Sequence, residues 1–365
     1  MPEYRITMSI AIFCKTLLKG GTEKQALMLS KLLAGQKTDV LLINWCGNKI
    51  DKENLGFIKN NSIKYVALKG NLFRKFFDFL KIIRDEKISF ILSYLTLPNF
   101  VSGISKLFVK NVTRIGGIRN EKLPYYKFIL ERWIHNNLNN ATVFNNYAAK
   151  DKFIKRGFKS SKIIVIQNAI ITDHKNGKER EPRSEIKIVT VSRFVKQKDF
   201  RTALYAFNEL NKRNKDKALT YYLVGYGPME QEIRSLSKDL KITEKIKIFI
   251  NPSDILDILT ECDIYLSTSL FEGLSNSIME AMVAGLPIVA TDVGDNKYLI
   301  KDGFNGFLIP CNNIGKIVEK LELLLQSEDI RNDFGNRSRT LIKSKFSQEK
   351  LLENYLNLLS EFQYN

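Results

Sequence analysis

Short apolar runs rich in β-branched residues alternate with longer amphipathic stretches along most of the chain. In the first half, the apolar runs predict strands at residues 6–13, 40–45, 88–95, 113–118, 142–145 and 163–166. The stretches between them predict amphipathic helices at residues 22–33, 72–84, 125–138 and 148–156. Regular alternation of strand and helix is typical of parallel sheets that helices cover on both faces.

A polar segment at residues 172–185 interrupts this alternation, and we interpret it as an interdomain linker. Strands are then predicted at residues 186–192, 221–225, 246–250, 264–267 and 287–291, and helices at 200–213, 229–239, 276–284 and 314–326. A chain of 365 residues is longer than one hydrophobic core normally supports. We therefore expect an α/β protein of two Rossmann-like domains, residues 1–171 and 186–346, with the ligand site in the cleft between them.

The positive charge of the chain is concentrated in its first half. The net charge is +18, and residues 1–180 hold 32 Lys and Arg against 13 Asp and Glu. The remaining residues hold 25 against 26. This asymmetry indicates that the first half meets a polyanion, either nucleic acid or an anionic membrane surface. A merely solubilising surface is the alternative interpretation.

The cysteines and the apolar runs bear on the cellular compartment. Four cysteines lie far apart in the sequence, which favours neither a disulfide framework nor a zinc site: Cys14, Cys46, Cys262 and Cys311. No apolar run reaches the ~18 residues of a membrane span. The first apolar run ends without a small-residue cleavage site, so we interpret it as a core strand rather than a signal peptide. These features predict a cytoplasmic protein.

The most informative segment is residues 269–295, in which a strand leads through a loop into a helix. Ser275 or Asn276 is placed to cap that helix, and Gly285 followed by Pro287 is placed to end it. The backbone N–H groups and the positive end of the helix dipole at residues 273–276 predict an anion site suited to a diphosphate.

This segment resembles the donor site of the family-4 group of retaining glycosyltransferases, in which seven residues separate two glutamates. Here the glutamates are Glu272 and Glu280, with GLSNSIM between them and AMVAGLPIVATDVGD after them. The resemblance implies the GT-B fold, in which two Rossmann-like domains face each other across a cleft and a C-terminal helix, here residues 347–365, crosses back to the N-terminal domain. The group includes many bacterial surface-polysaccharide enzymes.

Further matches to the group follow in the expected order. Arg193 and Lys198 resemble the two cations that hold the donor diphosphate, and Gly225 lies in a matching Gly-x-Gly-Pro turn. The resemblance assigns further donor contacts to the backbone of a strand end and of the helix start: Ile250, Asn251, Gly273, Leu274, Ser275 and Asn276. In the first half, Gly20 and Gly21 resemble an early loop that approaches the donor phosphate, and Thr22 is placed to cap the helix that follows.

One position departs from the group. Many members carry a histidine after a late strand of the N-terminal domain, and Arg119 takes that place here. Arg119 stays protonated and cannot act as a base. It is instead suited to stabilising negative charge on the leaving phosphate or to holding an anionic acceptor, and a structural role is an equal alternative.

The resemblance implies a hexosyl- or N-acetylhexosaminyltransferase that retains the anomeric configuration of a nucleotide sugar, with a UDP-sugar favoured. Glu272 would bind hydroxyls of the donor sugar and Glu280 the ribose, while Arg193, Lys198 and Arg119 would stabilise phosphate charge. No Asp-x-Asp pair is present, so neither a metal nor any other cofactor is expected.

The basic first half is the expected acceptor side. Residues 72–84 and 122–133 mix aromatic and cationic residues as interfacial helices do, although ordinary core-facing helices are the alternative. We expect a lipid-diphosphate-linked glycan acceptor, assembly of a surface glycan, and peripheral association with the inner face of the cell membrane through residues 1–180. Nucleic-acid binding is not expected, because the cations are dispersed among the strands and helices. A nucleic-acid-binding protein, a non-catalytic scaffold and a glycosidase remain as alternatives.

Overall fold

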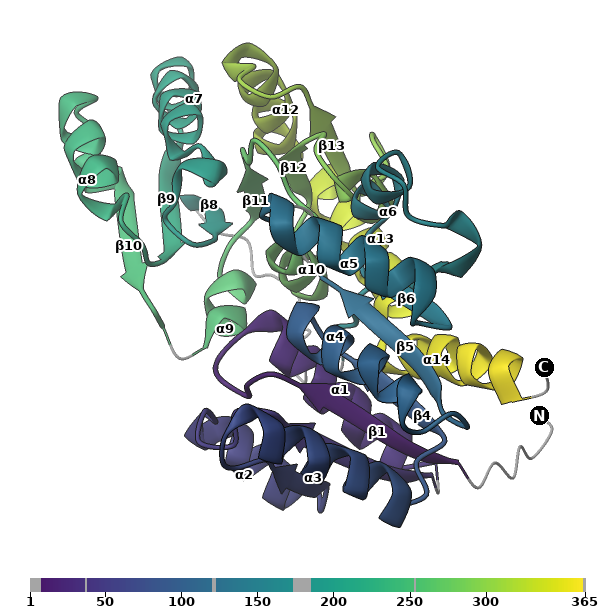
Figure 1. Ribbon diagram of the computed structural model, residues 1–365. Coiled ribbons are helices and arrows are strands. Elements are labelled where there is room, and N and C mark those ends of the chain that lie inside the picture. The colour runs from purple at the N-terminus through teal and green to yellow at the C-terminus, as the bar shows by residue number, and fades with distance from the viewer. Residues whose placement is uncertain (1–7, 37, 120–122, 173–184, 253, 364–365) are drawn as a thin grey trace. The chain divides into compact units, whose positions relative to one another are not determined.

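The computed structural model describes residues 8–36, 38–119, 123–172, 185–252 and 254–363. The chain divides into two compact units, which are the first unit, Met1–Ala169 with Gln348–Asn365, and the second unit, Ile170–Ser347 (Figure 1). Most of the predicted linker, at residues 173–184, lies outside the described residues. Residues 6 and 7 of the first predicted strand and residues 120–122 also lie outside them.

A parallel sheet in the order β3-β2-β1-β4-β5-β6-β7 forms the centre of the first unit. Its strands are β1 (Ser9–Cys14), β2 (Asp39–Asn44), β3 (Lys64–Ala67), β4 (Phe90–Ser93), β5 (Thr113–Ile118), β6 (Ala141–Phe144) and β7 (Ile163–Val165). Because side chains alternate across a strand, successive residues of β1 enter different cores. Ile10 and Ile12 enter one core, and Ala11 and Phe13 enter another.

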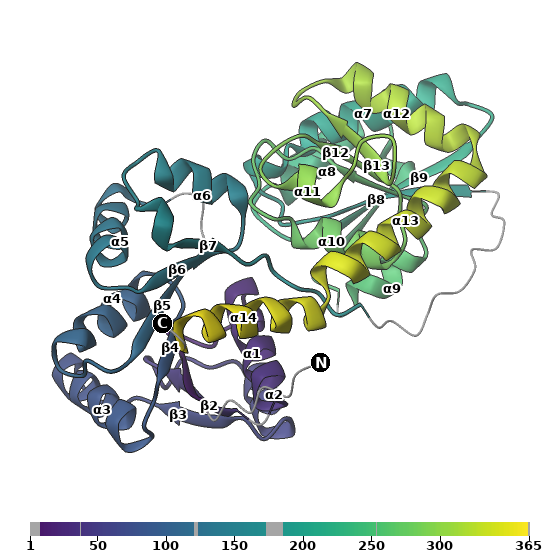
Figure 2. The same ribbon diagram turned by 90° about the vertical axis from the view of Figure 1, so that its right-hand side faces the viewer.

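Helices cover both faces of this sheet. The core with Ile10 is shared with α1 (Gly21–Ala34), α2 (Lys52–Asn60) and α14 (Gln348–Gln363), and the core with Phe13 is shared with α3 (Leu72–Asp85) and α4 (Thr96–Ile104). Towards β6 and β7 lie α5 (Tyr125–Asn137) and α6 (Tyr147–Ile154). Figure 2 shows α14, in yellow, beside α1. The predicted return of the C-terminal helix to the first unit is thereby confirmed.

The second unit is built on a parallel sheet in the order β10-β9-β8-β11-β12-β13. Its strands are β8 (Glu185–Val191), β9 (Ala218–Gly225), β10 (Ile246–Ile250), β11 (Ile264–Ser267), β12 (Ile288–Thr291) and β13 (Gly306–Ile309). Its helices are α7 (Phe200–Arg213), α8 (Glu230–Asp239), α9 (Ile255–Thr260), α10 (Asn276–Val283), α11 (Asn296–Leu299), α12 (Ile314–Gln326) and α13 (Glu328–Phe346).

Each sheet reverses its strand order at one point. In the second unit β8 pairs with β9 on one side and with β11 on the other, and in the first unit β1 pairs with β2 and with β4. The chain therefore leaves these neighbouring strands in opposite directions and opens a crevice at their carboxyl ends. Such a crevice is the usual ligand position in open α/β sheets.

The structure differs from the sequence prediction at several elements. The short strands β3 and β13 and the helices α2, α4, α9, α11 and α13 were not predicted. The long helix α13 has a polar sequence with Gly335 in its middle, so its apolar period is weak. The last helix begins at Gln348, one residue after the predicted start at residue 347, because Ser347 is extended (ψ 164°) and separates it from α13. Thr22 is not the N-cap of α1, because that helix begins one residue earlier, at Gly21.

The histidine that the structure describes, His135, is part of the fold of the first unit. It is buried on α5, and its ring nitrogens lie 2.8 Å from Thr142 Oγ1 and 3.0 Å from the carbonyl oxygen of Lys159. Burial lowers the pKa of His135 from 6.5 to about 4, although the Lys159 carbonyl opposes this change. The imidazole is therefore neutral at physiological pH.

We expect the stabilising effect of His135 to disappear in acid. Because its folded-state pKa lies below the unfolded-state value, its contribution is complete above about pH 6.5 and is lost as the pH falls toward 4. In urea unfolding, the difference in free energy between wild type and His135→Gln should shrink by about 2 kcal/mol between pH ~7 and pH ~4.5. A difference that does not change with pH would contradict this assignment.

Candidate functional site

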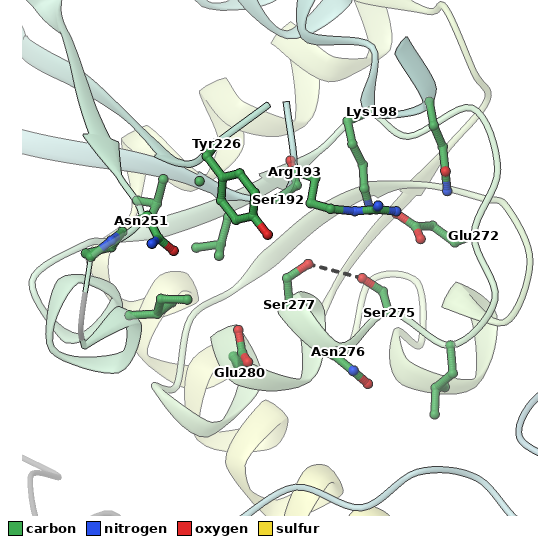
Figure 3. Close-up of a pocket in the computed structure, with 17 residues that line it drawn as sticks. Ser192, Arg193, Lys198, Tyr226, Asn251, Glu272, Ser275, Asn276, Ser277 and Glu280 are labelled. Atoms are coloured by element: carbon green, nitrogen blue, oxygen red, sulfur yellow. Dashed lines mark hydrogen bonds and ion pairs between the residues drawn. The ribbon is translucent and has the colours of Figure 1, made fainter. Parts of the chain in front are cut away.

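A pocket of about 420 Å³ lies in the second unit, at the carboxyl ends of β8, β9, β10 and β11 (Figure 3). This volume falls in the range of small-molecule sites. The pocket brings together nine of the residues that the sequence predicted as catalytic or donor-binding: Arg193, Lys198, Gly225, Asn251, Glu272, Leu274, Ser275, Asn276 and Glu280. Gly273 lies between two lining residues, and Ile250 precedes Asn251 without lining the pocket itself.

The start of α10 forms one wall of the pocket. Ser275 is the N-cap residue, as predicted, but its side chain makes no capping hydrogen bond to the helix within the described structure. Its hydroxyl lies instead 3.3 Å from Ser277 Oγ. A helix start without a side-chain cap keeps its positive partial charge directed at the pocket, so this wall is suited to an anion.

Two cations follow β8, and they differ in exposure and in ion pairing. Arg193 is exposed, and its guanidinium has no hydrogen-bond or ion-pair partner among the described residues. Lys198 forms a buried ion pair with Glu272, and their side chains are 14% and 9% exposed. Arg193 therefore carries an uncompensated charge beside the helix start, whereas the charge of Lys198 is already shared.

Glu272 is held firmly at one carboxylate oxygen. Its Oε1 accepts hydrogen bonds from Lys198 Nζ and, at 2.7 Å, from Ser269 Oγ. The other oxygen, Oε2, has no protein partner in the part of the chain that the structure describes. This geometry fixes the direction of the carboxylate and leaves one oxygen for a ligand hydroxyl.

Backbone contacts tie the loop after β8 to the loop after β11. Thr268 Oγ1 donates to the carbonyl oxygens of Lys198 and Asp199 at 3.0 and 2.9 Å. The Leu270 amide donates to the Gln197 carbonyl, and Gln197 Nε2 donates to the Phe271 carbonyl at 2.7 Å. These contacts place Lys198 and Glu272, which are 74 residues apart, side by side.

A glycine allows a second loop to pack closely against the loop that carries Glu272. Gly294 adopts a positive φ of 56°, and a Cβ built there would lie 1.9 Å from the carbonyl oxygen of Glu272. The neighbouring Asp295 amide donates to the Gly273 carbonyl at 3.1 Å. No side chain fits between these two loops, so Gly294 sets how closely they approach.

The far end of the pocket combines polar and aromatic groups. Figure 3 shows Tyr226, Asn251 and Glu280 on one side of the view and Lys198 and Glu272 on the other. Tyr226, Gln197 and Ser277 also line the pocket and were not predicted. Tyr226 lies inside the Gly-x-Gly-Pro turn at a position where the motif allows any residue, so its role required the structure.

The structure places the other predicted residues in the first unit, outside this pocket. Gly20 is the N-cap of α1 and Gly21 is the first residue of that helix. Arg119 follows β5 and donates to Asn168 Oδ1 and to the Tyr355 hydroxyl, both at 3.1 Å, while its guanidinium lies 5.0 Å from the centre of the Tyr94 ring. Its Nε is buried without a partner in the described structure. Arg119 thus has neutral hydrogen-bond partners and no carboxylate partner among them.

The described residues hold no group of three or more His, Cys, Asp and Glu side chains placed to bind a metal ion. None of their helices has the length and apolarity needed to cross a membrane.

Comparisons with known proteins agree with this geometry. Residues 172–341 match the family model described as glycosyl transferases group 1. An uncharacterized glycosyltransferase of Haemophilus influenzae is 28% identical over 354 residues, which cover 93% of this chain and 96% of that protein. The poly(ribitol-phosphate) alpha-N-acetylglucosaminyltransferase of Staphylococcus aureus is 30% identical over 148 residues, or 40% of this chain and 30% of that protein.

Among solved structures, Anabaena HepE in complex with UDP has a TM-score of 0.84 at 16% identity, with 97% of this chain and 100% of that chain covered. The fold of the chain is the GT-B fold of two Rossmann-like units. The match to glycosyl transferases group 1 covers residues 172–341, which make up most of the second unit, and it confirms the resemblance seen in the sequence.

We expect Gly294→Ala to disorder the donor pocket. The added Cβ meets the Glu272 carbonyl at 1.9 Å, and the positive φ adds strain, so the loop that carries Glu272 must move. Nucleotide-sugar binding should fall at least tenfold, measured by isothermal titration calorimetry. The matched control is Gly303→Ala, because Gly303 has a similar φ of 70° and no atom within 4 Å of its added Cβ. Equal binding by the two variants would contradict this role of Gly294.

Proposed function

We propose that this protein is a retaining, metal-independent glycosyltransferase. It transfers a hexosyl or N-acetylhexosaminyl group from a nucleoside diphosphate sugar to a glycan acceptor carried on a lipid diphosphate. The observation that carries the proposal is the combination, in one pocket, of Arg193, which has no partner among the described residues, with the start of α10, where the Ser275 side chain makes no capping hydrogen bond in the described structure. Together they form a preorganised anion site with the Lys198–Glu272 pair beside it.

The anion site is suited to a diphosphate. Arg193 presents a planar fork of donors to phosphate oxygens, and the backbone at residues 273–276 supplies N–H donors from the helix start. Lys198 can turn toward the phosphate while it keeps contact with Glu272. As the bond between sugar and phosphate breaks, the growing negative charge on the phosphate meets donors that are already in place.

The carboxylate of Glu272 serves the sugar rather than the phosphate. With Oε1 held by Lys198 and Ser269, Oε2 accepts a hydrogen bond from a sugar hydroxyl and stabilises positive charge on the ring. The acceptor hydroxyl attacks from the face that the diphosphate leaves, and a leaving-phosphate oxygen takes its proton. The bond to the new oxygen forms on the same face as the broken one, so the anomeric configuration is retained without a protein base.

The other end of the pocket is assigned to the nucleoside. Glu280 accepts hydrogen bonds from ribose hydroxyls, and the base lies near Asn251 and Tyr226. The structural neighbour HepE is solved with UDP, which supports a uridine nucleotide here. In the first unit, Gly20 and Gly21 contribute backbone contacts to the donor, and Arg119 pairs with phosphate charge on the acceptor or the leaving group.

An exposed apolar patch in the first unit supports a lipid-linked acceptor. On α3 the side chains of Leu72, Phe73 and Phe77 are 67%, 77% and 61% exposed, while Phe79 and Ile83 of the same helix are buried. Leu107 and Phe108 extend the patch, because Phe108 packs against Phe76 of α3 at 5.5 Å between ring centres. Neighbouring exposed apolar side chains of this kind are typical of interaction sites.

Positively charged side chains near this patch favour an anionic partner. Exposed cations lie on the same segments, namely Arg74, Lys81 and Arg84 on α3 and Lys106 beside Leu107. Aromatic side chains with a basic rim are suited to the interface of an anionic membrane, where the acceptor lipid would lie. We therefore propose peripheral binding to the inner face of the cell membrane through α3. Tyr125 and Tyr126 at the start of α5 are also exposed and provide a second contact.

The donor assignment predicts a selective thermal shift. A nucleoside diphosphate sugar at a hundredfold excess over its dissociation constant should stabilise the protein by about 2.7 kcal/mol. Arg193→Ala should weaken that binding by about tenfold or more, since it removes charge-assisted hydrogen bonds. The control is Arg201→Ala, an exposed arginine of the same unit outside the pocket. Stabilisation by nucleic acid but by no nucleotide sugar would instead favour the nucleic-acid alternative.

The membrane assignment predicts vesicle binding through α3. In co-sedimentation at low salt, wild type should bind phosphatidylglycerol-containing vesicles, and the double variant Phe73→Ser, Phe77→Ser should lose most of that binding. Leu323→Ser is the control, because Leu323 is 40% exposed in the second unit. Undiminished binding by the double variant, or no binding by wild type, would refute the role of α3.

A further inference from the structure

The carboxyl ends of β4 and β5, in the first unit, carry the two side chains that stack on each other, Tyr94 and Arg119. Neither strand end is held by ladder bonds alone. A buried network of hydrogen-bonded side chains connects the two strand ends, and it consists of Ser93, Asn99 and Glu131. Nothing in the reaction described above uses this network, although all three of its side chains are at most 2% exposed.

Asn99 lies at the centre of the network, and its side chain hydrogen-bonds to the backbone of Gly117. Its Oδ1 accepts from the Gly117 amide at 3.1 Å and from Ser93 Oγ at 2.8 Å. Its Nδ2 donates to the Gly117 carbonyl at 3.2 Å. One side-chain amide thus pairs with both polar groups of Gly117, as a neighbouring strand would, and it connects that residue to the end of β4.

Two glycines and one residue with a positive φ allow the ends of β4 and β5 to lie this close to each other and to Asn99. A Cβ at Gly117 would lie 2.7 Å from the Ser93 carbonyl oxygen, and one at Gly116 would lie 3.3 Å from Asn99 Oδ1. Leu95, which follows Tyr94, has a φ of 72°, and its amide donates to the Gly117 carbonyl at 3.0 Å. A non-glycine residue holds such a φ only where its surroundings compensate the strain, and strain of this kind is concentrated at functional sites.

Glu131 on α5 is a further buried partner of the Asn99 amide. Asn99 Nδ2 donates to both carboxyl oxygens, at 3.2 and 3.1 Å. The Gly117 N–H can only donate and its carbonyl can only accept, so Oδ1 faces the N–H, and the NH2 group faces the carbonyl and Glu131. Burial raises the pKa of Glu131 to about 7, and hydrogen bonds from Asn99 and Thr96 oppose that rise. Both of these partners are neutral, so no cation explains why the acid is buried there.

We infer that Asn99 and Glu131 are positioning residues that hold the ends of β4 and β5 together, so that Tyr94 and Arg119 stay stacked at the acceptor side of the reaction. Arg119 is two residues beyond Gly117, and Tyr94 is one residue before Leu95. A shift of either strand end therefore moves one partner of the stacked pair. This inference rests on the proposed role of Arg119, and it adds two residues to that site that touch no substrate.

The first experiment observes Arg119 directly, without any ligand. In protein labelled with ¹⁵N-arginine, Arg119→Lys identifies the Arg119 Nε–H signal, which should exchange slowly because that atom is buried. Asn99→Ala and Glu131→Leu should shift the signal and speed its exchange at least tenfold. Glu131→Gln should leave it near the wild-type position, because glutamine keeps an acceptor for Asn99.

The control for a merely structural effect lies on the same helix. His135→Gln removes another buried polar contact of α5 and should lower the melting temperature without moving the Arg119 signal. If Asn99→Ala does not fold, Ser93→Ala decides the question, since it removes one hydrogen bond to Asn99 Oδ1 and should move the signal in the same direction. An unchanged Arg119 signal in folded Asn99→Ala, or in Ser93→Ala, overturns the inference.

A kinetic experiment separates this inference from the proposed function. With a nucleotide sugar and a polyprenyl-diphosphate-linked saccharide, Asn99→Ala should lower kcat/KM for the acceptor about tenfold and leave nucleotide-sugar affinity unchanged. Glu131→Gln should restore most of the activity that Glu131→Leu loses. If Arg119→Lys transfers normally, the proposed role of Arg119 fails. If Arg119→Lys is impaired while Asn99→Ala is normal, the positioning inference alone fails.

Discussion

The largely buried ion pair between Lys198 and Glu272 is the interaction on which the pocket of the second unit depends. Taking two charges out of water is costly, and the pair repays that cost only with good geometry and further hydrogen bonds. Here Ser269 supplies an additional donor to Glu272, and Thr268 and Gln197 lock the two loops that carry the pair. The strand order β9-β8-β11 brings these loops together, so the pair is a consequence of the fold.

This arrangement leaves the charges that a ligand needs. Lys198 and Glu272 satisfy each other, while Arg193 and the start of α10 remain directed at the pocket. A diphosphate therefore meets donors that need little rearrangement, which is the condition for stabilising developing charge in a transition state. The first unit shows a comparable design at its own strand ends, where Asn99 and Glu131 support Arg119 through the backbone of Gly117.

The sequence predicted the parts of this protein that local pattern encodes. The alternation of strands and helices, the start of α10 and the spacing of Glu272 and Glu280 were all readable. Contacts between residues far apart in the chain were not. Gln197 and Phe271, Arg119 and Tyr355, or Asn99 and Glu131 become neighbours only through the topology of the sheets. The helix α13 escaped prediction because its polar face dominates its sequence.

The most direct test of this account is a crystal structure of the protein with uridine diphosphate. The account predicts that phosphate oxygens lie within ~3 Å of the Arg193 guanidinium and of backbone N–H groups at the start of α10. It also predicts that Glu280 lies at the ribose and that the Lys198–Glu272 pair is retained or shared with the phosphate. A nucleotide bound with its phosphates away from Arg193 and α10 would contradict the account.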